Sequence, residues 1–474
     1  MPPHSAAAVA DGVPGSTDVR VRLRSPARLR NIELLLLVVA SLLGAAAIAL
    51  VQLGALGAVD QTILTYSAGL AGLALVMHLV LRIVASQADP FILPIATLLN
   101  GLGIAMIYRL DISAGRAGWG ASGVRQMVWS AVAILAAITV LLVIRNHRVL
   151  QRYRYIAMAT GIALLLLPLV PGLGREINGA QVWIGLGPRR ADGSVPLSFQ
   201  PGELAKIALA IFFAGYLVTA RDTLSLVGRR LFGIRFPRVR DLGPILVVWL
   251  AAMAVLVFQR DLGTSLLYFG LFLVVIYVAT ARIGWVLLGL GLFLGGALAA
   301  SRLLGYVGGR FDGWLAAFDS DVYSQPGGSY QLVQGIFGIA RGGLVGTGLG
   351  QGSPDIVPFA ESDFIIASLG EELGLTGLFA ILLLFLLFVS RGFRIGFAGQ
   401  DDFGRLLGVG LSFVVALQVF IVVGGVTRVI PLTGLTTPFM AAGGSSLVAN
   451  WIIAALLLRL SDTVRTQPRL VIDS

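Results

Sequence analysis

Long apolar stretches recur along this chain, and they exclude a soluble fold. Each stretch has about 18–24 mostly apolar residues, enough for a helix to cross a hydrocarbon core of about 30 Å. Charged residues make up 12% of the chain, against about 25% in soluble domains. A transmembrane β-barrel would need shorter segments of alternating polarity. The sequence therefore predicts an all-α polytopic membrane protein.

About twelve transmembrane helices are expected, in one domain from residue 32 to residue 461. Their approximate ranges are 32–52, 62–85, 90–107, 124–144, 153–171, 204–220, 242–258, 264–280, 284–304, 364–390, 405–424 and 446–461. Residues 1–31 contain Pro, Ala, Ser and several arginines, and we expect a disordered basic tail there. Residues 462–474 are expected to form a short tail after the last span.

The arginines indicate how the helices are oriented. If the spans alternate in direction, about two thirds of the 35 Lys and Arg residues lie on one side, and cationic loops stay in the cytoplasm. We therefore expect a protein of the cytoplasmic membrane with both termini inside. The net charge of +11 then reflects orientation and contact with membrane lipids. No nucleic-acid partner is expected, because the basic clusters are short and border the spans.

One long polar loop interrupts the apolar pattern between the ninth and tenth spans. Residues 305–363 are rich in Gly, Ser and Asp, and the orientation places them outside the cytoplasm. The loop carries Asp312, Asp319 and Asp321, followed by a glycine-rich stretch at residues 327–331. Long loops in compact proteins tend to be functional or disordered. With no Cys and three scattered His residues, no Cys- or His-based metal site is expected.

Several charged residues stand at the outer ends of spans. Each must be paired with an opposite charge or be in contact with water there. Glu203 and Lys206 are three residues apart on one helix face. They predict either an interfacial ion pair or a polar headgroup site. Asp261 lies in a tight polar reversal between two spans, which predicts either a local Arg–Asp hairpin or part of such a site.

The tenth span and the stretch after the eleventh carry further polar residues. Ser362 is expected to cap the helix that begins near Phe364, with Asp363 at its positive end. Glu371 and Glu372 follow two turns later, inside an otherwise apolar helix. Residues 427–446 contain two prolines and paired glycines, which predict a re-entrant or broken helix that lines a polar cavity.

Taken in order, these elements resemble the SEDS family of shape, elongation, division and sporulation proteins, which includes RodA and FtsW. The matching elements are Val124-Arg125-Gln126, Asn178-Gly179-Ala180, Phe199-Gln200-Pro201-Gly202-Glu203 with Lys206, Asp261-Leu262-Gly263-Thr264, Tyr330-Gln331, Gly342-Gly343-Leu344, Asp363-Phe364-Ile365, Glu371-Glu372-Leu373-Gly374 and Pro431-Leu432-Thr433-Gly434 with Gly443-Gly444-Ser445-Ser446. The resemblance covers about residues 124–460. It implies a ten-helix core, with two added N-terminal helices as in actinobacterial-looking relatives.

The resemblance also implies an activity. Such a protein would be a peptidoglycan glycosyltransferase that polymerises lipid II on the outer face of the membrane. Its expected partner is a class B penicillin-binding protein, the transpeptidase that cross-links the strands. The short C-terminal tail and the amino-acid sequence of residues 427–438 are more similar to RodA than to FtsW, so a role in elongation is favoured over division. A lipid II flippase is the alternative, and an ion-coupled transporter is disfavoured because no internal repeat is visible.

The resemblance assigns roles to residues of the site. Asp321 is the expected catalytic base and Asp319 the alternative, because nine positions separate Asp321 from Tyr330, more than relatives usually have. Further positions of the family fall around a polar outer cavity and are expected to bind substrate: Arg125, Glu203, Lys206, Asp261, Asp363, Glu371 and Ser445. No cofactor is expected, and a divalent cation at the pyrophosphate stays an open alternative.

Overall fold

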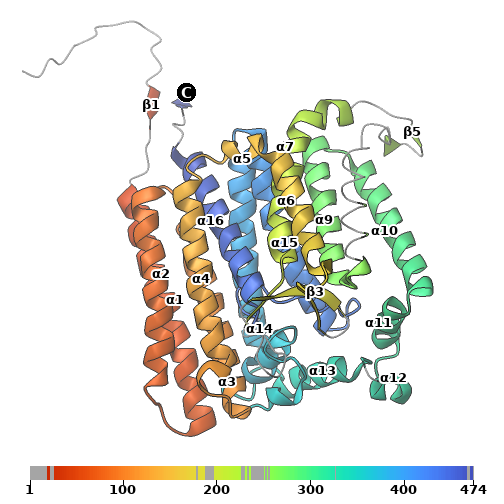
Figure 1. Cartoon of the computed structure of the whole chain (residues 1–474). Helices are drawn as coiled ribbons and strands as arrows, with labels where there is room; N and C mark the ends of the chain where they lie inside the picture. Colours follow the sequence, from red (N-terminus) through yellow and green to blue (C-terminus); the bar gives the residue numbers. More distant parts are fainter. Residues whose placement is uncertain are drawn as a thin grey trace, which may run out of the picture.

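The protein is a bundle of long helices, most of which have nearly parallel axes (Figure 1). The computed structural model describes residues 19–21, 26–177, 180–186, 197–225, 230–231, 234–235, 250, 254, 257–325, 327–466 and 470–472. Ten helices of this described part are long and apolar enough to cross a membrane. They are α1 (Pro26–Leu56), α2 (Thr62–Val84), α3 (Ile92–Ser113), α4 (Ser122–Val143), α7 (Gly202–Ser225), α9 (Leu262–Thr280), α10 (Ile283–Leu303), α14 (Ile365–Ala398), α15 (Asp402–Val426) and α16 (Gly444–Thr466).

Shorter elements join the long helices. The short helices are α5 (Arg148–Arg152), α6 (Arg154–Leu166), α11 (Gly305–Leu315), α12 (Ser320–Ser324) and α13 (Tyr330–Gly342), with 3-10 turns at Gly118–Gly120, Leu167–Leu169 and Pro354–Ile356. The strands are β1 (Val19–Val21), β2 (Gly174–Ile177), β3 (Ala180–Leu186), β4 (Leu197–Phe199), β5 (Arg230–Leu231), β6 (Ile234–Arg235) and β7 (Leu470–Ile472). They form three small antiparallel sheets, ordered β1-β7, β2-β3-β4 and β5-β6.

The all-α membrane fold is confirmed, and ten of the twelve expected spans correspond to these long helices. The expected span at 153–171 is wrong in length, because α6 ends after 13 residues and passes into a 3-10 turn at Pro168. The expected span at 242–258 lies largely outside the described residues. Asn178 and Gly179, two positions of the family resemblance, lie outside them as well.

The polar loop at residues 305–363 folds into the short helices α11, α12 and α13 rather than into an irregular loop. These helices lie at the end of the bundle opposite the two termini (Figure 1). The strand β1 near the N-terminus pairs with β7 near the C-terminus. The described fold therefore agrees with both termini being on one side and the loop on the other.

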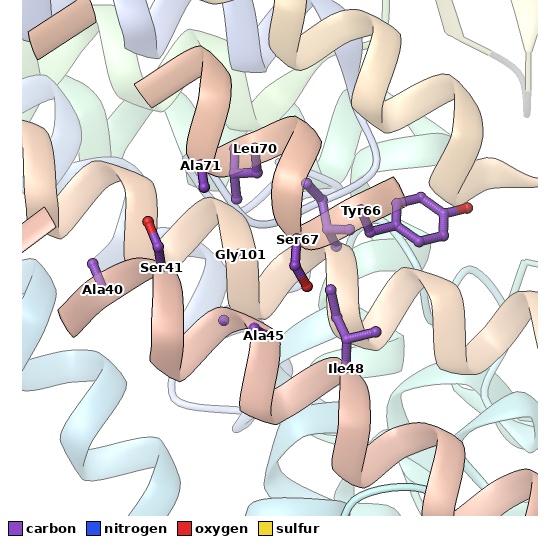
Figure 2. A pocket seen from close by; sticks show the side chains of 11 residues that line it. Ala40, Ser41, Ala45, Ile48, Tyr66, Ser67, Leu70, Ala71 and Gly101 are labelled. Atoms are coloured by element: carbon purple, nitrogen blue, oxygen red, sulfur yellow. The ribbon is translucent and has the colours of Figure 1, made fainter. Parts of the chain in front are cut away.

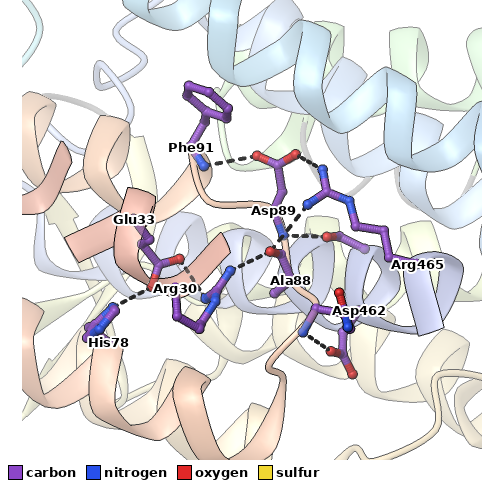
Figure 3. A network of polar contacts seen from close by, with 10 residues as sticks. Arg30, Glu33, His78, Ala88, Asp89, Phe91, Asp462 and Arg465 are labelled. Atoms are coloured by element: carbon purple, nitrogen blue, oxygen red, sulfur yellow. Dashed lines mark hydrogen bonds and ion pairs between the residues drawn. The ribbon is translucent and has the colours of Figure 1, made fainter. Parts of the chain in front are cut away.

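The first and last long helices continue beyond the expected spans, and ion pairs lie in these extensions (Figure 3). Helix α1 begins at Pro26, and Arg30 within it is buried and bonds Glu33 at 2.7 Å. The other carboxylate oxygen of Glu33 lies 2.7 Å from Nδ1 of His78 on α2. At the far end of the chain, α16 continues to Thr466.

The connection between α2 and α3 is bonded to the end of α16 (Figure 3). The backbone N–H of Asp89 donates to Ser461 at 2.6 Å, and the backbone N–H of Gln87 donates to Asp462 at 2.9 Å. The carboxylate of Asp89 pairs with Arg465. These contacts attach the two N-terminal helices to the last helix of the bundle.

Small residues let α1, α2 and α3 approach closely. Ala40, Ala45, Ser67 and Gly101 lie around a small cavity between these helices (Figure 2). A side-chain carbon placed on Gly44 would lie 3.6 Å from the Cα atom of Gly101. Close backbone approach at small residues is how helices associate without a hydrophobic driving force in lipid.

Gly103 of α3 permits the closest contact between the N-terminal half and the segment before α16. A Cβ atom on Gly103 would lie 2.2 Å from the carbonyl oxygen of Met440. We predict that Gly103→Ala lowers the stability of the detergent-purified protein by about 1–3 kcal/mol, because the backbones must separate. Gly72→Ala on α2 is the matched control, since nothing lies within 4 Å of that position. An equal loss of thermal stability in both variants would contradict the packing assigned to Gly103.

Candidate active site

A partly buried segment without helix or strand bonds several polar residues of the bundle. Helix α15 ends at Val426 and α16 begins at Gly444, and the described residues 427–443 between them are irregular. We call this the 427–443 segment. Thr437, Phe439 and Met440 within it are almost fully buried. The predicted break is present as an irregular segment between the two helices, whereas a re-entrant path and a polar cavity lined by it stay predictions.

Side chains from three helices bond the carbonyl groups of the 427–443 segment. Gln126 of α4 donates to the carbonyl of Ala441 at 3.0 Å. Gln418 of α15 donates to the carbonyl of Thr436 at 2.8 Å. Arg310 of α11 donates to the carbonyl of Leu432 at 2.8 Å. Irregular backbone at membrane depth is tolerated only where protein or water satisfies its polar groups. These donors satisfy carbonyl groups of the 427–443 segment.

Glu203 and Lys206 form a buried ion pair on the first turns of α7. The Lys206 ammonium lies 2.6 Å from the Glu203 carboxylate and 2.9 Å from the side-chain oxygen of Gln418. Lys206 is only 1% exposed. Because Gln418 also bonds Thr436, the pair is connected to the 427–443 segment. The expected pairing is present, and the ammonium group of Lys206 is enclosed by Glu203 and Gln418. The substrate contact expected for Lys206 stays a prediction.

Asp261 is placed by the start of α9. Its carboxylate accepts from the backbone N–H of Thr264 at 3.0 Å and from the hydroxyl of the same residue at 2.6 Å, which caps the helix. Gln200 joins it to Ser445: its side chain donates to Asp261 at 3.3 Å, and its backbone N–H donates to the Ser445 hydroxyl at 2.7 Å. Burial raises the pKa of Asp261, while the bonds from Thr264 lower it.

Asp363 lies against the 427–443 segment just before α14. A Cβ atom on Gly434 would be 3.5 Å from Oδ2 of Asp363. Burial raises the pKa of Asp363 to about 6, partly offset by a bond from Ser362 and by the charge of Arg310. Arg310 also lowers the pKa of Asp261, and Asp261 raises that of Asp363. The charge of one arginine therefore acts on both carboxylates.

A second polar group lies where α3, α4 and the start of α14 meet. Arg116 contacts the carboxylates of Asp111 and Glu361, each at 3.1 Å. The carbonyl of Glu361 accepts from the N–H of Ala442 at 2.7 Å, which joins this group to the 427–443 segment. Arg125 is half-buried one turn into α4 and donates to Ser122, which also accepts from Arg116.

The two candidate bases differ in how their carboxylates are used. Asp319 caps the short helix α12 and accepts from the backbone N–H of Asp321 at 3.1 Å. Asp321 stands in the first turn of α12 and is exposed, and within the described residues its carboxylate has no hydrogen-bond or ion-pair partner. The carboxylate of Asp321 is therefore exposed and unengaged, whereas one oxygen of Asp319 is used in the cap.

The glycine-rich turn at residues 327–329 holds α12 in place. The hydroxyl of Ser329 donates to the carbonyl of Ala317 at 2.6 Å, and its N–H donates to the carbonyl of Val322 at 3.2 Å. A side chain at Gly328 would meet that same Val322 carbonyl at 2.0 Å. Only glycine fits there without moving α12.

Arg428 connects this loop to the 427–443 segment. Its guanidinium donates to the carbonyls of Trp314 at 2.7 Å and Leu315 at 2.9 Å, and Trp314 donates back to the carbonyl of Arg428 at 3.1 Å. The backbone of Arg428 has a φ of 61°, a left-handed conformation rare for a residue with a side chain. The last turn of α11 is therefore tied to the segment that gathers the polar cluster.

Glu371 and Glu372 are buried as expected, but they lie at a loop away from the Asp261–Arg310–Asp363 group. Glu371 accepts from the N–H of Ser353 at 2.8 Å, and Glu372 pairs with Arg109 at 3.0 Å. These bonds hold both carboxylates within the structure, and the substrate contact expected for Glu371 stays a prediction. The cap expected from Ser362 is also wrong: its hydroxyl donates to the carbonyl of Phe359, and Phe364 is the N-cap residue.

The sequence missed Arg310 and Gln418. Arg310 lies in the loop expected outside the cytoplasm, where arginines are scarce, and that position was the available signal. Gln418 stands inside an apolar span, and a single uncharged amide there gives no charge or motif from which a role could be predicted. Both bond carbonyls of the 427–443 segment, whose path no local pattern reveals.

Comparisons with known proteins cover most of the chain. A family model described as "Cell cycle protein" for FtsW, RodA and SpoVE matches residues 90–466, so the match begins before the expected residue 124 and after helices α1 and α2. The chain is 46% identical to the peptidoglycan glycosyltransferase RodA of Mycobacterium tuberculosis over 93% of each chain. It is 32% identical to the stage V sporulation protein E of Bacillus subtilis, over 71% of this chain and 86% of that protein.

Two solved structures share the fold. One, described under "Structural coordination of polymerization and crosslinking by a peptidoglycan synthase complex", has a TM-score of 0.62 at 26% identity and covers 80% of this chain and 99% of that chain. The other is the rod shape determining protein RodA of Thermus thermophilus, with a TM-score of 0.55 at 26% identity, covering 80% of this chain and 98% of that chain.

The buried Glu203–Lys206 pair generates a stability prediction. Lys206→Met strands the Glu203 carboxylate in a buried place, and we expect a loss of about 3–5 kcal/mol. The double variant Glu203→Gln/Lys206→Met should recover most of that loss, because no buried charge is left unpaired. Thermal unfolding in detergent measures both. Arg82→Met, at an exposed cation, is the control and should change stability by less than about 0.5 kcal/mol; equal losses in all variants would contradict the pair's burial.

The raised pKa of Asp363 generates a pH prediction. The folded state holds this proton more tightly than the unfolded chain, with a pKa of about 6 against 3.8. Its contribution to stability is therefore present below about pH 4 and lost as the pH rises through about 6. The melting temperature of the wild type, relative to that of Asp363→Asn, should fall across this window. A difference that stays constant with pH would show that Asp363 is not desolvated.

Proposed function

The chain belongs to the cell cycle protein family of FtsW, RodA and SpoVE, and we propose that it polymerises lipid II into glycan strands on the outer face of the cytoplasmic membrane. It is a multi-pass membrane protein. It is also a peptidoglycan glycosyltransferase, the name carried by relatives 46% identical to it over 93% of its length. The proposal adds the substrate, the side of the membrane and the residues that act.

The arrangement of charges supports the outer location. Cationic loops favour the cytoplasm, and most arginines between spans fall on the side of the termini. The helices α11, α12 and α13 lie at the opposite end (Figure 1). We therefore take both termini as cytoplasmic and residues 305–363 as an extracytoplasmic catalytic loop within a transmembrane domain.

The reaction joins two lipid-linked sugars. The 4-hydroxyl oxygen of one sugar attacks the anomeric carbon of the other, and the bond from that carbon to undecaprenyl pyrophosphate breaks. The pyrophosphate leaves with the bonding electrons, and a base takes the proton of the attacking hydroxyl. Asp321 is the base we propose, because its carboxylate is exposed and uncommitted within the described residues. Asp319 supports it through the bond to the Asp321 N–H.

The leaving pyrophosphate needs positive charge. Arg310 of α11 is half-buried, and its charge lowers the pKa of Asp261 and of Asp363. Arg125 is half-buried at the start of α4. We propose these two guanidinium groups as the pyrophosphate contacts. Lys206 positions the cluster through Glu203 and Gln418.

Metal binding has a limited place in this proposal. Within the described residues no group of three or more His, Asp or Glu side chains is arranged to hold an ion. A divalent cation would therefore arrive with the pyrophosphate of the substrate. The chain's own contribution would be the arginine contacts.

One observation carries the proposal: the 427–443 segment binds both the charged cluster and the loop that bears the base. Arg310 bonds Leu432 of this segment, and Arg428 bonds the end of α11, shortly before α12. A shared anchor of this kind fixes the distance between a base and the group that stabilises the leaving pyrophosphate.

The alternative is a lipid II flippase, which would use the polar cluster without an external base. The glycosyltransferase name of the mycobacterial relatives favours the polymerase. Since these relatives are RodA proteins, we propose a role in elongation and cell shape rather than in division. The solved complex that couples polymerization and crosslinking supports a class B penicillin-binding protein as the partner.

Replacing Asp321 tests the base. Asp321→Asn should reduce lipid II polymerisation by purified protein with its partner by about 10² to 10⁴-fold. Asp319→Asn should retain most activity, because Asn also caps a helix N-terminus. Asp312→Asn, at another exposed loop carboxylate, is the matched control and should be unaffected.

The outcomes separate the hypotheses. Full polymerisation by the Asp321→Asn variant would remove Asp321 as the base. If the wild type forms no polymer but moves labelled lipid II across liposomes, the flippase reading replaces the polymerase.

A further inference from the structure

A basic groove lies outside the candidate active site, at the turn between α5 and α6. The groove has a volume of about 380 Å³. It is lined by Arg148, Gln151, Arg152, Arg154 and Tyr155. No acidic residue is among them, so the groove presents three positive charges together.

The arginines of the groove differ in how firmly they are held. Arg154 donates to the carbonyl of Gly215 at 3.1 Å and to Thr219 at 2.8 Å, and its guanidinium lies 5.1 Å from the ring centre of Tyr155. Arg152 is exposed, and within the described part of the chain its guanidinium has no partner. One arginine therefore fixes the wall of the groove, while another is available to a ligand.

One carboxylate forms a long ion pair with the groove and offsets part of its charge. Asp401 lies 4.0 Å from Arg148, beyond normal hydrogen-bond length, so this pair leaves the donors of Arg148 unbonded by Asp401. Its oxygens are already engaged by Nε2 of His147 at 2.9 Å and by the N–H of Gly404 at 2.7 Å. Arg148 is exposed and can therefore turn its remaining donors toward an anion.

The surroundings of the groove are those of a membrane interface. The side chains beside the arginines are exposed, and they are apolar or aromatic: Val149, Tyr153, Tyr155 and Ile156. Helix α6 continues from this point as an apolar helix. Tyrosines and arginines at the end of an apolar helix mark the depth of lipid headgroups.

We propose that this groove binds the phosphodiester headgroup of an anionic phospholipid, with the acyl chains along the exposed side of α6. Guanidinium groups bind phosphate oxygens through paired, charge-assisted hydrogen bonds. Basic pockets at the ends of membrane helices favour anionic lipids. The exposed apolar side chains explain why the ligand is a lipid rather than a free anion.

The test uses the full chain in nanodiscs of phosphatidylcholine, with or without phosphatidylglycerol. Native mass spectrometry measures the phosphatidylglycerol that stays bound after release from the disc. The variant Arg148→Gln/Arg152→Gln should retain phosphatidylglycerol about tenfold more weakly than the wild type. The variant Arg28→Gln/Arg82→Gln is the matched control: it removes two exposed charges outside the groove and should bind like the wild type.

Further measurements could contradict the proposal. Equal loss in both double variants, or equal retention of the two lipids by the wild type, would overturn it. Inorganic phosphate added to phosphatidylcholine discs should not raise the melting temperature; a rise that depends on Arg152 would assign the groove to free phosphate instead. If the double variant does not purify, Arg152→Gln alone should show a smaller loss in the same direction.

Discussion

The need to satisfy a buried irregular backbone governs the centre of this protein. Residues 427–443 have neither helix nor strand to pair their carbonyl groups, and unpaired polar groups at membrane depth cost several kcal/mol each. Arg310, Gln418 and Gln126 supply the missing donors from three different helices. The irregular backbone therefore explains why polar side chains gather here. The same side chains belong to the candidate active site.

The same constraint divides the charged residues into two kinds. Lys206 is enclosed by Glu203 and Gln418 and supports the segment. Asp321 is exposed on a short helix that is held in place through its flanking turns. A base must meet a mobile substrate, whereas a supporting pair must exclude water. In the proposed reaction the loop would supply the base and the bundle would hold the supporting pair. Arg428 connects the two parts, because it bonds the end of α11.

The sequence was sufficient for features that depend on local pattern. Apolar length predicted ten helices that the structure contains, and the prolines and glycines after α15 predicted the break. Features that depend on contacts between residues far apart in the sequence could not be predicted. The burial of Arg30 depends on Glu33 and on the carbonyl of Ala88. The bond from Lys206 to Gln418 could not be predicted, because the two residues are 212 positions apart.

The central claim is that lipid-linked substrate meets the 427–443 segment and the loop that it anchors. A lipid II analogue with a photoreactive group beside its pyrophosphate measures this directly, because cross-linked peptides can be identified by mass spectrometry. The account predicts adducts in α11, α12 and residues 427–443, reduced by competing natural lipid II. Adducts confined to other helices, such as α1 and α2, would contradict it.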